Sequence, residues 1–244
     1  MDSDDAKNKN KRVVLLTGFG PFGKHTSNPS WTIVQKVADI WNHHDHLVIE
    51  QVEVAYDYVN SELPLLWDKY NPDLVIHCGV SHSKNTIHLE KCAHTSGYER
   101  LDVRQCTGPV ETDCDCLYTT LGVDDIIQDV RQSSGDIIQH GRHSSDDIIQ
   151  DGRHGSFDII QDGKDKSNAI IQDTRDGSDS KVVIESSTNA GRYLCEYIFF
   201  KSLELKRAPV LFIHVPDLTG DVNSEHVAKA VRCVIEACLS QLAS

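Results

Sequence analysis

The segment VVLLTGFGPFGK, residues 13–24, places an unbroken apolar run directly before a glycine-rich turn. A short apolar run that ends at such a turn predicts a buried strand. Helical spacing of apolar residues then extends from Ser30 to Trp41, directly after Asn28 and Pro29. Asparagine and proline in these positions are typical of a helix start. This part of the chain therefore predicts a strand, a turn and a helix.

The same alternation continues along most of the chain. Further strands are predicted at 47–54, 74–78, 86–92, 182–186 and 210–214, and further helices at 56–70, 123–130, 191–205 and 224–242. Several of the predicted strands are apolar throughout, which is typical of a parallel sheet covered by helices on both faces. We therefore expect an α/β fold, a single three-layer α/β/α domain with a mostly parallel, twisted sheet.

Length and charge narrow the class of protein. A chain of 244 residues can bury the core of one large α/β domain. Its net charge of -13 and pI near 5.3 make it a poor general ligand for nucleic acid or anionic membranes. The longest apolar run, 208–213, is about six residues, whereas a membrane-spanning helix needs roughly 20. We expect neither nucleic acid nor membrane as a partner.

The N-terminus and the cysteines predict a cytoplasmic protein. Residues 1–12 are charged and lack the apolar segment of a secretory signal. The eight cysteines show no disulfide framework, so free thiols in a reducing compartment are expected. Cys106, Cys114 and Cys116 are too few and too irregularly spaced for a closed zinc site. No metal and no cofactor is therefore expected.

An internal repeat separates two parts of the predicted domain. Ile-Ile pairs begin at 126, 137, 148, 159 and 170, a period of 11 residues. Repeats often form solenoids, and this period can also form a right-handed helical coil. However, each copy offers few apolar groups, and residues 124–180 contain 13 acidic and 6 basic residues. We expect a disordered tail at 1–11 and a domain at 12–244, interrupted at about 133–180 by a mobile insert of which only the first copy is ordered.

The glycine-rich turn allows a phosphate-binding interpretation. Gly18, Gly20 and Gly23 match the G-x-G-x-x-G dinucleotide fingerprint, and Glu50 near the end of the next strand stands where a ribose-binding carboxylate would lie. Gly18 with Gly23 and the following lysine also nearly match a P-loop, although His25 replaces the Ser or Thr that would hold Mg²⁺. A nucleotide-binding α/β protein is therefore an alternative function.

Other residues of the turn argue against a phosphate. Phe19 and Phe22 crowd the loop, Pro21 removes a backbone donor, and the predicted helix begins only near Ser30. A phosphate cradle needs free N–H groups that open directly into a helix. Two aromatic side chains instead suit a small, flat, uncharged ligand, or simply fill a structural turn.

Three residues have the side chains of an activated thiol. Cys195 follows a strand and the loop 187–191, where Thr188 or Asn189 could cap a helix whose positive end favours a thiolate. His214 ends an apolar strand, and Glu90 is an acid within an apolar stretch. Separately, a buried cysteine, a structural histidine and a surface acid are the ordinary interpretations. Together, the three would form a nucleophile with an oriented base.

Five ordered motifs resemble the pyroglutamyl peptidase I family of cysteine peptidases, which remove an N-terminal pyroglutamyl residue. The motifs lie outside the tail and the repeat and span about three quarters of the chain. They are LTGFGPFG with NPSW (16–23 and 28–31), HCGVS (77–81), LEKC with GY and LD (89–92, 97–98 and 101–102), AGRYLC (190–195) and FIHVP (212–216).

The resemblance implies a role for each matching residue. Cys195 would be the nucleophile, His214 the base and Glu90 the carboxylate that orients the imidazole. Three aromatic residues and one backbone segment would hold the lactam ring, namely Phe19, Phe22, Tyr193 and the backbone near Val80. Pyroglutamyl-blocked peptides would be the substrate. The resemblance leaves the oligomeric state open.

Two departures from the family pattern stand out. Lys24 replaces a glycine, which is expected to change only the loop surface. The repeat replaces a short link between a helix and the strand before the nucleophile loop. In a parallel sheet such a link lies at the edge opposite the site, so we expect the insert to leave catalysis intact. A catalytically silent interaction protein that recruits partners through the acidic repeat is a second alternative.

Overall fold

The computed structural model describes residues 11–22, 27–110, 115–133, 182–218 and 222–243, and the backbone of 169–171. The strands of the main sheet are β1 (Val13–Phe19), β2 (His46–Val52), β3 (Leu74–Ser81), β4 (Thr86–Glu90), β7 (Ala169–Ile171), β8 (Val182–Ser187) and β9 (Val210–Pro216). The helices are α2 (Pro29–Asp39), α3 (Tyr56–Tyr70), α4 (Val123–Ser133), α5 (Leu194–Leu205) and α6 (Ser224–Gln241). The predicted alternation of strands and helices is confirmed.

The strands form a seven-stranded sheet in the order β2-β1-β3-β9-β4-β8-β7. The four strands β2, β1, β3 and β9 are parallel to one another. β4 is antiparallel to β9, β8 runs parallel to β4, and β7 is antiparallel to β8. The sheet is therefore mostly parallel, as predicted, but one part of it runs in the reverse direction.

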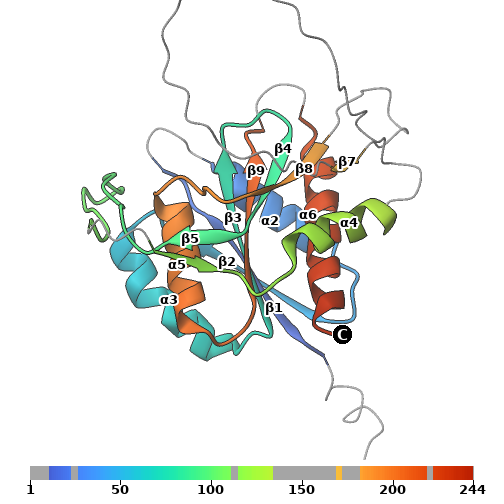
Figure 1. Ribbon diagram of the computed structural model, residues 1–244, viewed down its shortest axis with the longest axis horizontal. Helices are drawn as coiled ribbons and strands as arrows, with labels where there is room; N and C mark the ends of the chain where they lie inside the picture. Colours follow the sequence, from blue (N-terminus) through green and yellow to red (C-terminus); the bar gives the residue numbers. More distant parts are fainter. Residues whose placement is uncertain are drawn as a thin grey trace, which may run out of the picture.

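Helices cover both faces of the sheet and make the three layers (Figure 1). α3 and α5 pack on one face, around Leu15, Val75 and Phe212. α2, α4 and α6 pack on the other face, around Leu16 and Ile76. No helix of the described residues combines the length and the apolar character that a membrane crossing requires.

The alternation of side chains along the strands decides what faces α5. In β9, Leu211 and Ile213 belong to the core under α2 and α6, whereas Phe212 belongs to the core under α5. Because successive strand residues point to opposite faces, His214 lies on the α5 face with Phe212. By the same alternation, Glu90 of β4 faces α5, since Leu89 packs under α2 and α6.

The reversed strands correct one expectation about the repeat. Val183 of β8 pairs with Thr86, and β4 runs antiparallel to β9, so β8 starts at the carboxyl end of β9. The link that carries the repeat therefore joins the sheet at the edge where β1, β3 and β9 end, and not at the opposite edge. The prediction was wrong because it assumed that β8 is parallel to β9.

The repeat itself is described at its two ends. The first copy forms α4, where Ile126 and Ile127 are buried. The last copy contributes β7 at the edge of the sheet, so the expectation that only the first copy is ordered was wrong. The remaining copies and the predicted tail lie largely outside the described residues. A second, two-stranded sheet of β5 (Cys92–His94) and β6 (Cys116–Tyr118) was not predicted.

Candidate active site

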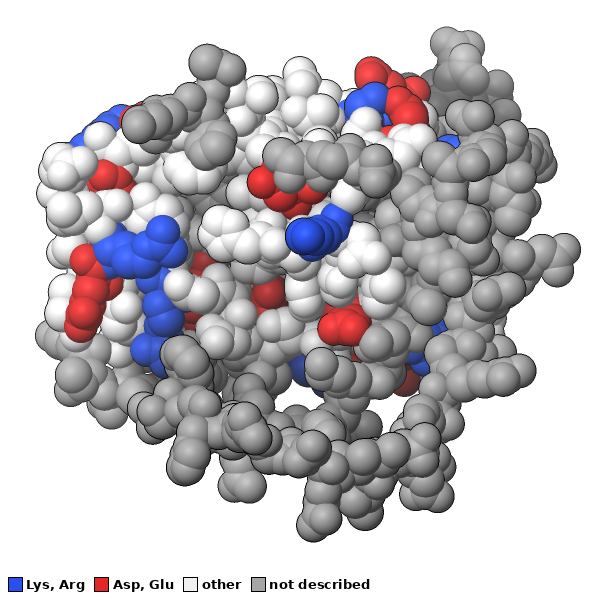
Figure 2. Space-filling view, turned by 90° about the horizontal axis from the view of Figure 1, so that it is seen from above, with Lys and Arg blue, Asp and Glu red and all other residues white. Residues whose placement is uncertain are grey.

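A cavity of about 440 Å³ opens at the carboxyl ends of β1, β3 and β9, on the α5 face of the sheet. Figure 2 looks down on this edge of the sheet. Acidic and basic side chains of the described residues are interspersed there, so this face does not carry charge of one sign alone. All seven predicted site residues line the cavity: Phe19, Phe22, Val80, Glu90, Tyr193, Cys195 and His214. The sequence motifs, far apart in the chain, therefore meet at one place.

The turn before Cys195 has an unusual backbone. Gly191 and Arg192 have φ angles of 90° and 51°, both in the left-handed region. Helix α5 begins only after them, so Cys195 is its second residue. The expectation that Thr188 or Asn189 caps the helix was wrong, because the N-cap is Tyr193, whose side chain makes no capping hydrogen bond. Asn189 instead accepts the N–H of Gly191 at 3.2 Å.

A glycine makes room for the sulfur of Cys195. A Cβ atom at Gly79 of β3 would lie 2.6 Å from Cys195 Sγ and 2.7 Å from Phe212 Cζ. Both distances are far shorter than a van der Waals contact, so only glycine lets the sulfur rest against the strand. β3 therefore forms the floor on which the thiol lies.

His214 connects the thiol to a buried acid. Its Nδ1 lies 2.7 Å from Glu90 Oε1, and it lines the same cavity as Cys195. Burial lowers the pKa of His214, but the hydrogen bonds and charges of Cys195 and Glu90 outweigh burial and raise the pKa above its ordinary value. The site therefore favours an imidazolium between two potential anions.

Glu90 directs its charge at the imidazole. The residue is 1% exposed. Its second carboxylate oxygen, Oε2, is buried and has no hydrogen-bond partner among the described residues. Because no other described group neutralises this carboxylate through a hydrogen bond, His214 is the partner that balances it.

Aromatic side chains form the apolar part of the cavity. Phe19 is 4% exposed and packs with the α5-side core, and Phe22 packs against the same cluster. The Tyr193 hydroxyl donates to the Leu101 carbonyl at 3.1 Å, and the Arg100 guanidinium lies 4.3 Å from the Tyr193 ring centroid. The tyrosine ring is thus held at its hydroxyl and on one face, and it forms one wall of the cavity.

The described part of the glycine-rich turn, residues 18–22, is not built as a phosphate cradle. α2 begins at Pro29 with Asn28 as its cap, and Asn28 accepts the N–H of Ser30 at 3.1 Å. The N–H of Phe19 already donates to Ser30 Oγ. Glu50, the proposed ribose ligand, pairs with Lys69 at 3.3 Å and accepts the Tyr70 hydroxyl. The groups that a nucleotide would need are therefore engaged elsewhere.

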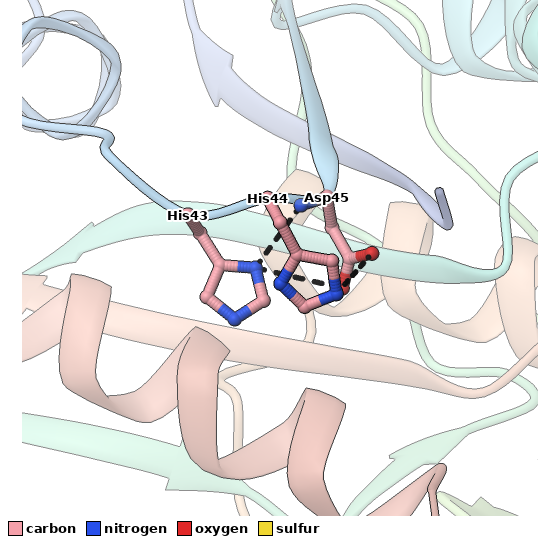
Figure 3. A group of neighbouring side chains, drawn as sticks. All are labelled: His43, His44 and Asp45. Atoms are coloured by element: carbon pink, nitrogen blue, oxygen red, sulfur yellow. Dashed lines mark hydrogen bonds and ion pairs between the residues drawn. The ribbon is translucent and has the colours of Figure 1, made fainter. Parts of the chain in front are cut away.

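One cluster of potential metal ligands lies away from the cavity, directly before β2 (Figure 3). His43, His44 and Asp45 place their ligand atoms within 4.8 Å of one another. However, Asp45 accepts two hydrogen bonds from Arg12 at 3.0 Å, and the Asp45 N–H donates to His43 Nδ1. These groups satisfy one another in a surface turn at the amino end of β2, and we assign no metal to them.

Comparison with known proteins agrees with the motifs. The sequence pattern of the family "Pyroglutamyl peptidase" matches residues 12–134. Pyroglutamyl-peptidase 1 of Mus musculus is 33% identical over 95% of this chain and 92% of its own length. The chain belongs to the pyroglutamyl peptidase family. The human protein of the same name is 32% identical over the same shares.

Solved structures of the pyroglutamyl peptidase family share the fold. Pyrrolidone carboxyl peptidase from Thermococcus litoralis has a TM-score of 0.68 at 19% identity and covers 95% of each chain. Pyroglutamyl peptidase I from Bacillus amyloliquefaciens has a TM-score of 0.66 at 19% identity and covers 94% of this chain and 98% of its own. At this identity the likeness concerns the fold alone.

Two residues at the site of this pyroglutamyl peptidase were missed by sequence reasoning. Gly79 stands in a strand motif without any turn signal, and nothing in the sequence shows that a sulfur will rest on it. Glu196 follows the cysteine and reads as a surface acid, yet it is fully buried. No local sequence signal shows that the sulfur lies against Gly79 or that Glu196 is buried.

Proposed function

We propose that this member of the pyroglutamyl peptidase family hydrolyses the bond after an N-terminal pyroglutamyl residue through a thioester on Cys195. The observation that carries the proposal is the meeting of a thiol, an imidazole and a carboxylate in one cavity with aromatic walls. Glu90 orients the ring of His214, and His214 exchanges protons with sulfur, amine and water.

The reaction consists of two acyl transfers. The Cys195 thiolate attacks the pyroglutamyl carbonyl carbon, so that a C–S bond forms and the carbonyl oxygen becomes an oxyanion. The C–N bond then breaks, and the His214 imidazolium gives its proton to the departing amine. Water attacks the thioester, His214 takes its proton, and the C–S bond breaks to release pyroglutamate and the thiolate.

The start of α5 supplies donors for the oxyanion. The N–H groups of Gly191 and Arg192, in the loop before Cys195, are engaged with Asn189 and Glu196 and are therefore occupied. The first N–H groups of a helix have no intrahelical partner, and no side chain caps α5. We assign the oxyanion to these first-turn N–H groups, next to the sulfur.

The aromatic walls explain why a pyroglutamyl group is preferred. Its lactam ring carries no α-ammonium charge, and a charged N-terminus would lose its hydration in this cavity without a compensating partner. Phe19, Phe22 and Tyr193 hold the ring, and the backbone near Val80 bonds the lactam amide. An aminopeptidase of ordinary N-termini would need an acid in the place of these aromatic rings.

The same reasoning bears on the protein's surroundings. The described cysteines are all free thiols, as is typical of a reducing compartment, and we infer a cytoplasmic location from them. The negative net charge disfavours nucleic acid and anionic membranes as partners.

Turnover of fluorogenic amides tests the proposal. The pyroglutamyl amide is expected to be hydrolysed, and the matched prolyl and glutaminyl amides are not. Cys195→Ala is expected to abolish turnover. Equal turnover of all three amides, or full activity of Cys195→Ala, contradicts the proposal. A thermal shift with NAD or ATP tests the nucleotide-binding alternative, which requires stabilisation by the ligand.

A further inference from the structure

We propose that Glu196 is a positioning residue, which fixes the turn before Cys195 and thereby sets where the sulfur lies relative to His214. The inference rests on the peptidase activity proposed above. Glu196 does not line the cavity, so it does not touch the substrate. Its side chain points from α5 toward β5 and is fully buried.

Both carboxylate oxygens of Glu196 are engaged. Oε2 accepts the N–H of Arg192 at 2.6 Å. Oε1 accepts the backbone N–H of His94 at 2.8 Å and lies 2.5 Å from His94 Nδ1. The carboxylate therefore ties the turn before the nucleophile to β5. Hydrogen bonds to a buried carboxylate are among the stronger ones in proteins.

The bond to Arg192 falls where the backbone needs support. A left-handed φ of 51° is unfavourable for a residue with a Cβ atom and persists only when the surroundings enforce it. The Arg192 side chain packs closely against Gly97, where a Cβ would lie 2.5 Å from Arg192 Nη1. Glu196 therefore supplies the side-chain hydrogen bond to the backbone of this left-handed residue.

The position of this turn decides the geometry of the thiol. Arg192 lies three residues before Cys195. Between them, Tyr193 is the N-cap residue of α5, and its side chain makes no capping hydrogen bond. The floor under the sulfur leaves little freedom, because Gly79 is already in close contact. If the turn relaxes, α5 starts differently, and the sulfur and the first-turn N–H groups move together. This predicts a loss in kcat rather than in substrate binding.

The variant Glu196→Gln tests the role. The glutamine amide has an acceptor oxygen at one end only. Its NH2 group would therefore face one of the two backbone donors, the N–H of Arg192 or the N–H of His94. We expect kcat to fall about 10-fold or more, with KM within about twofold of the native value, because misplaced reacting groups lower the rate of chemistry. Glu204 is an exposed acid on the same helix and pairs with Lys201. Glu204→Gln is therefore the matched control, and it is expected to keep the native kcat.

A second readout needs no substrate. The rate at which iodoacetamide alkylates Cys195, followed by mass spectrometry of its peptide, is expected to fall in Glu196→Gln and to stay native in Glu204→Gln. Native alkylation and native kcat in a folded Glu196→Gln protein overturn the proposal, and so does a change confined to KM. Failure of the native protein to hydrolyse the pyroglutamyl amide overturns the proposed function, while alkylation still tests the turn.

Two further variants separate positioning from folding. Glu196→Asp keeps the buried charge but is one methylene too short to reach both partners, and it is expected to lose kcat in the same way even if Glu196→Gln does not fold. Arg192→Gly combined with Glu196→Gln is expected to regain part of the lost kcat, because glycine adopts a left-handed φ without strain. Native kcat in Glu196→Asp, or no recovery in the double variant, contradicts the role.

Discussion

Gly79→Ala is the substitution that most directly challenges the geometry of the site. The new methyl group would lie 2.6 Å from Cys195 Sγ, whereas non-bonded heavy atoms of this kind rest about 3.5–4.0 Å apart. Phe212 is fully buried and cannot make room on the other side. The sulfur must therefore move by about 1 Å away from β3.

The size of this shift sets the expected loss. A displacement of about 1 Å between reacting groups costs roughly 100-fold in rate, which corresponds to about 2.7 kcal/mol of transition-state stabilisation. Overpacking of the strand is expected to cost about 1–3 kcal/mol in the free energy of unfolding. Activity is therefore expected to fall while most of the protein remains folded at 25 °C.

The assay compares kcat/KM for a pyroglutamyl amide with the midpoint of thermal unfolding. Gly20→Ala, directly after the end of β1, is a matched control, because its Cβ would meet Gln51 at 3.4 Å, an ordinary contact. We expect Gly20→Ala to retain kcat/KM within about threefold. A folded Gly79→Ala protein with native kcat/KM would refute the proposed seating of the sulfur.

Three further predictions follow from the site and the insert. Hydrogen bonds and charges raise the pKa of His214, so its imidazolium persists above the ordinary pH range and is lost as the pH rises through the raised pKa. Glu90→Gln is therefore expected to move the alkaline limb of the kcat/KM profile to lower pH and to lower kcat about 10-fold. An alkaline limb that does not move would contradict the pairing of Glu90 with His214. Phe22→Ala removes part of an apolar wall and is expected to raise KM about 10-fold in initial-rate measurements, with kcat nearly native; an unchanged KM would show that this ring does not hold the lactam. Excision of residues 136–166, which spares β7, is expected to leave kcat/KM within about twofold because every described residue that lines the cavity lies outside the excised part; loss of activity in a folded excision variant would show that the insert takes part.

The main elements were predictable because their patterns are local. The apolar runs of β1 and β9 and the helical spacing of α2 and α6 specify these elements in the sequence itself. The direction of β4 and β8 was not predictable in this way, because an apolar strand reads the same in a parallel and in an antiparallel pair. β5 and β6 have three residues each, too few for a periodic signal.

The candidate site was predictable only in part. Motif resemblance selected Cys195, His214 and Glu90, and the structure brings them together because alternate residues of β4 and β9 face α5. Spacing alone favoured the ordinary interpretation of each residue. The expected cap at Thr188 or Asn189 failed because two left-handed residues delay the start of α5. Such backbone angles depend on distant partners, here β5 through Glu196.

The central claim is that the sulfur of Cys195 carries the pyroglutamyl group during turnover. Rapid acid quenching of the protein with excess pyroglutamyl ester, followed by digestion and mass spectrometry, tests it directly. We expect the peptide that contains Cys195 to gain the mass of one pyroglutamyl group, and the adduct to disappear when the substrate is exhausted. An adduct on another residue, or fast turnover by Cys195→Ala, would contradict the account.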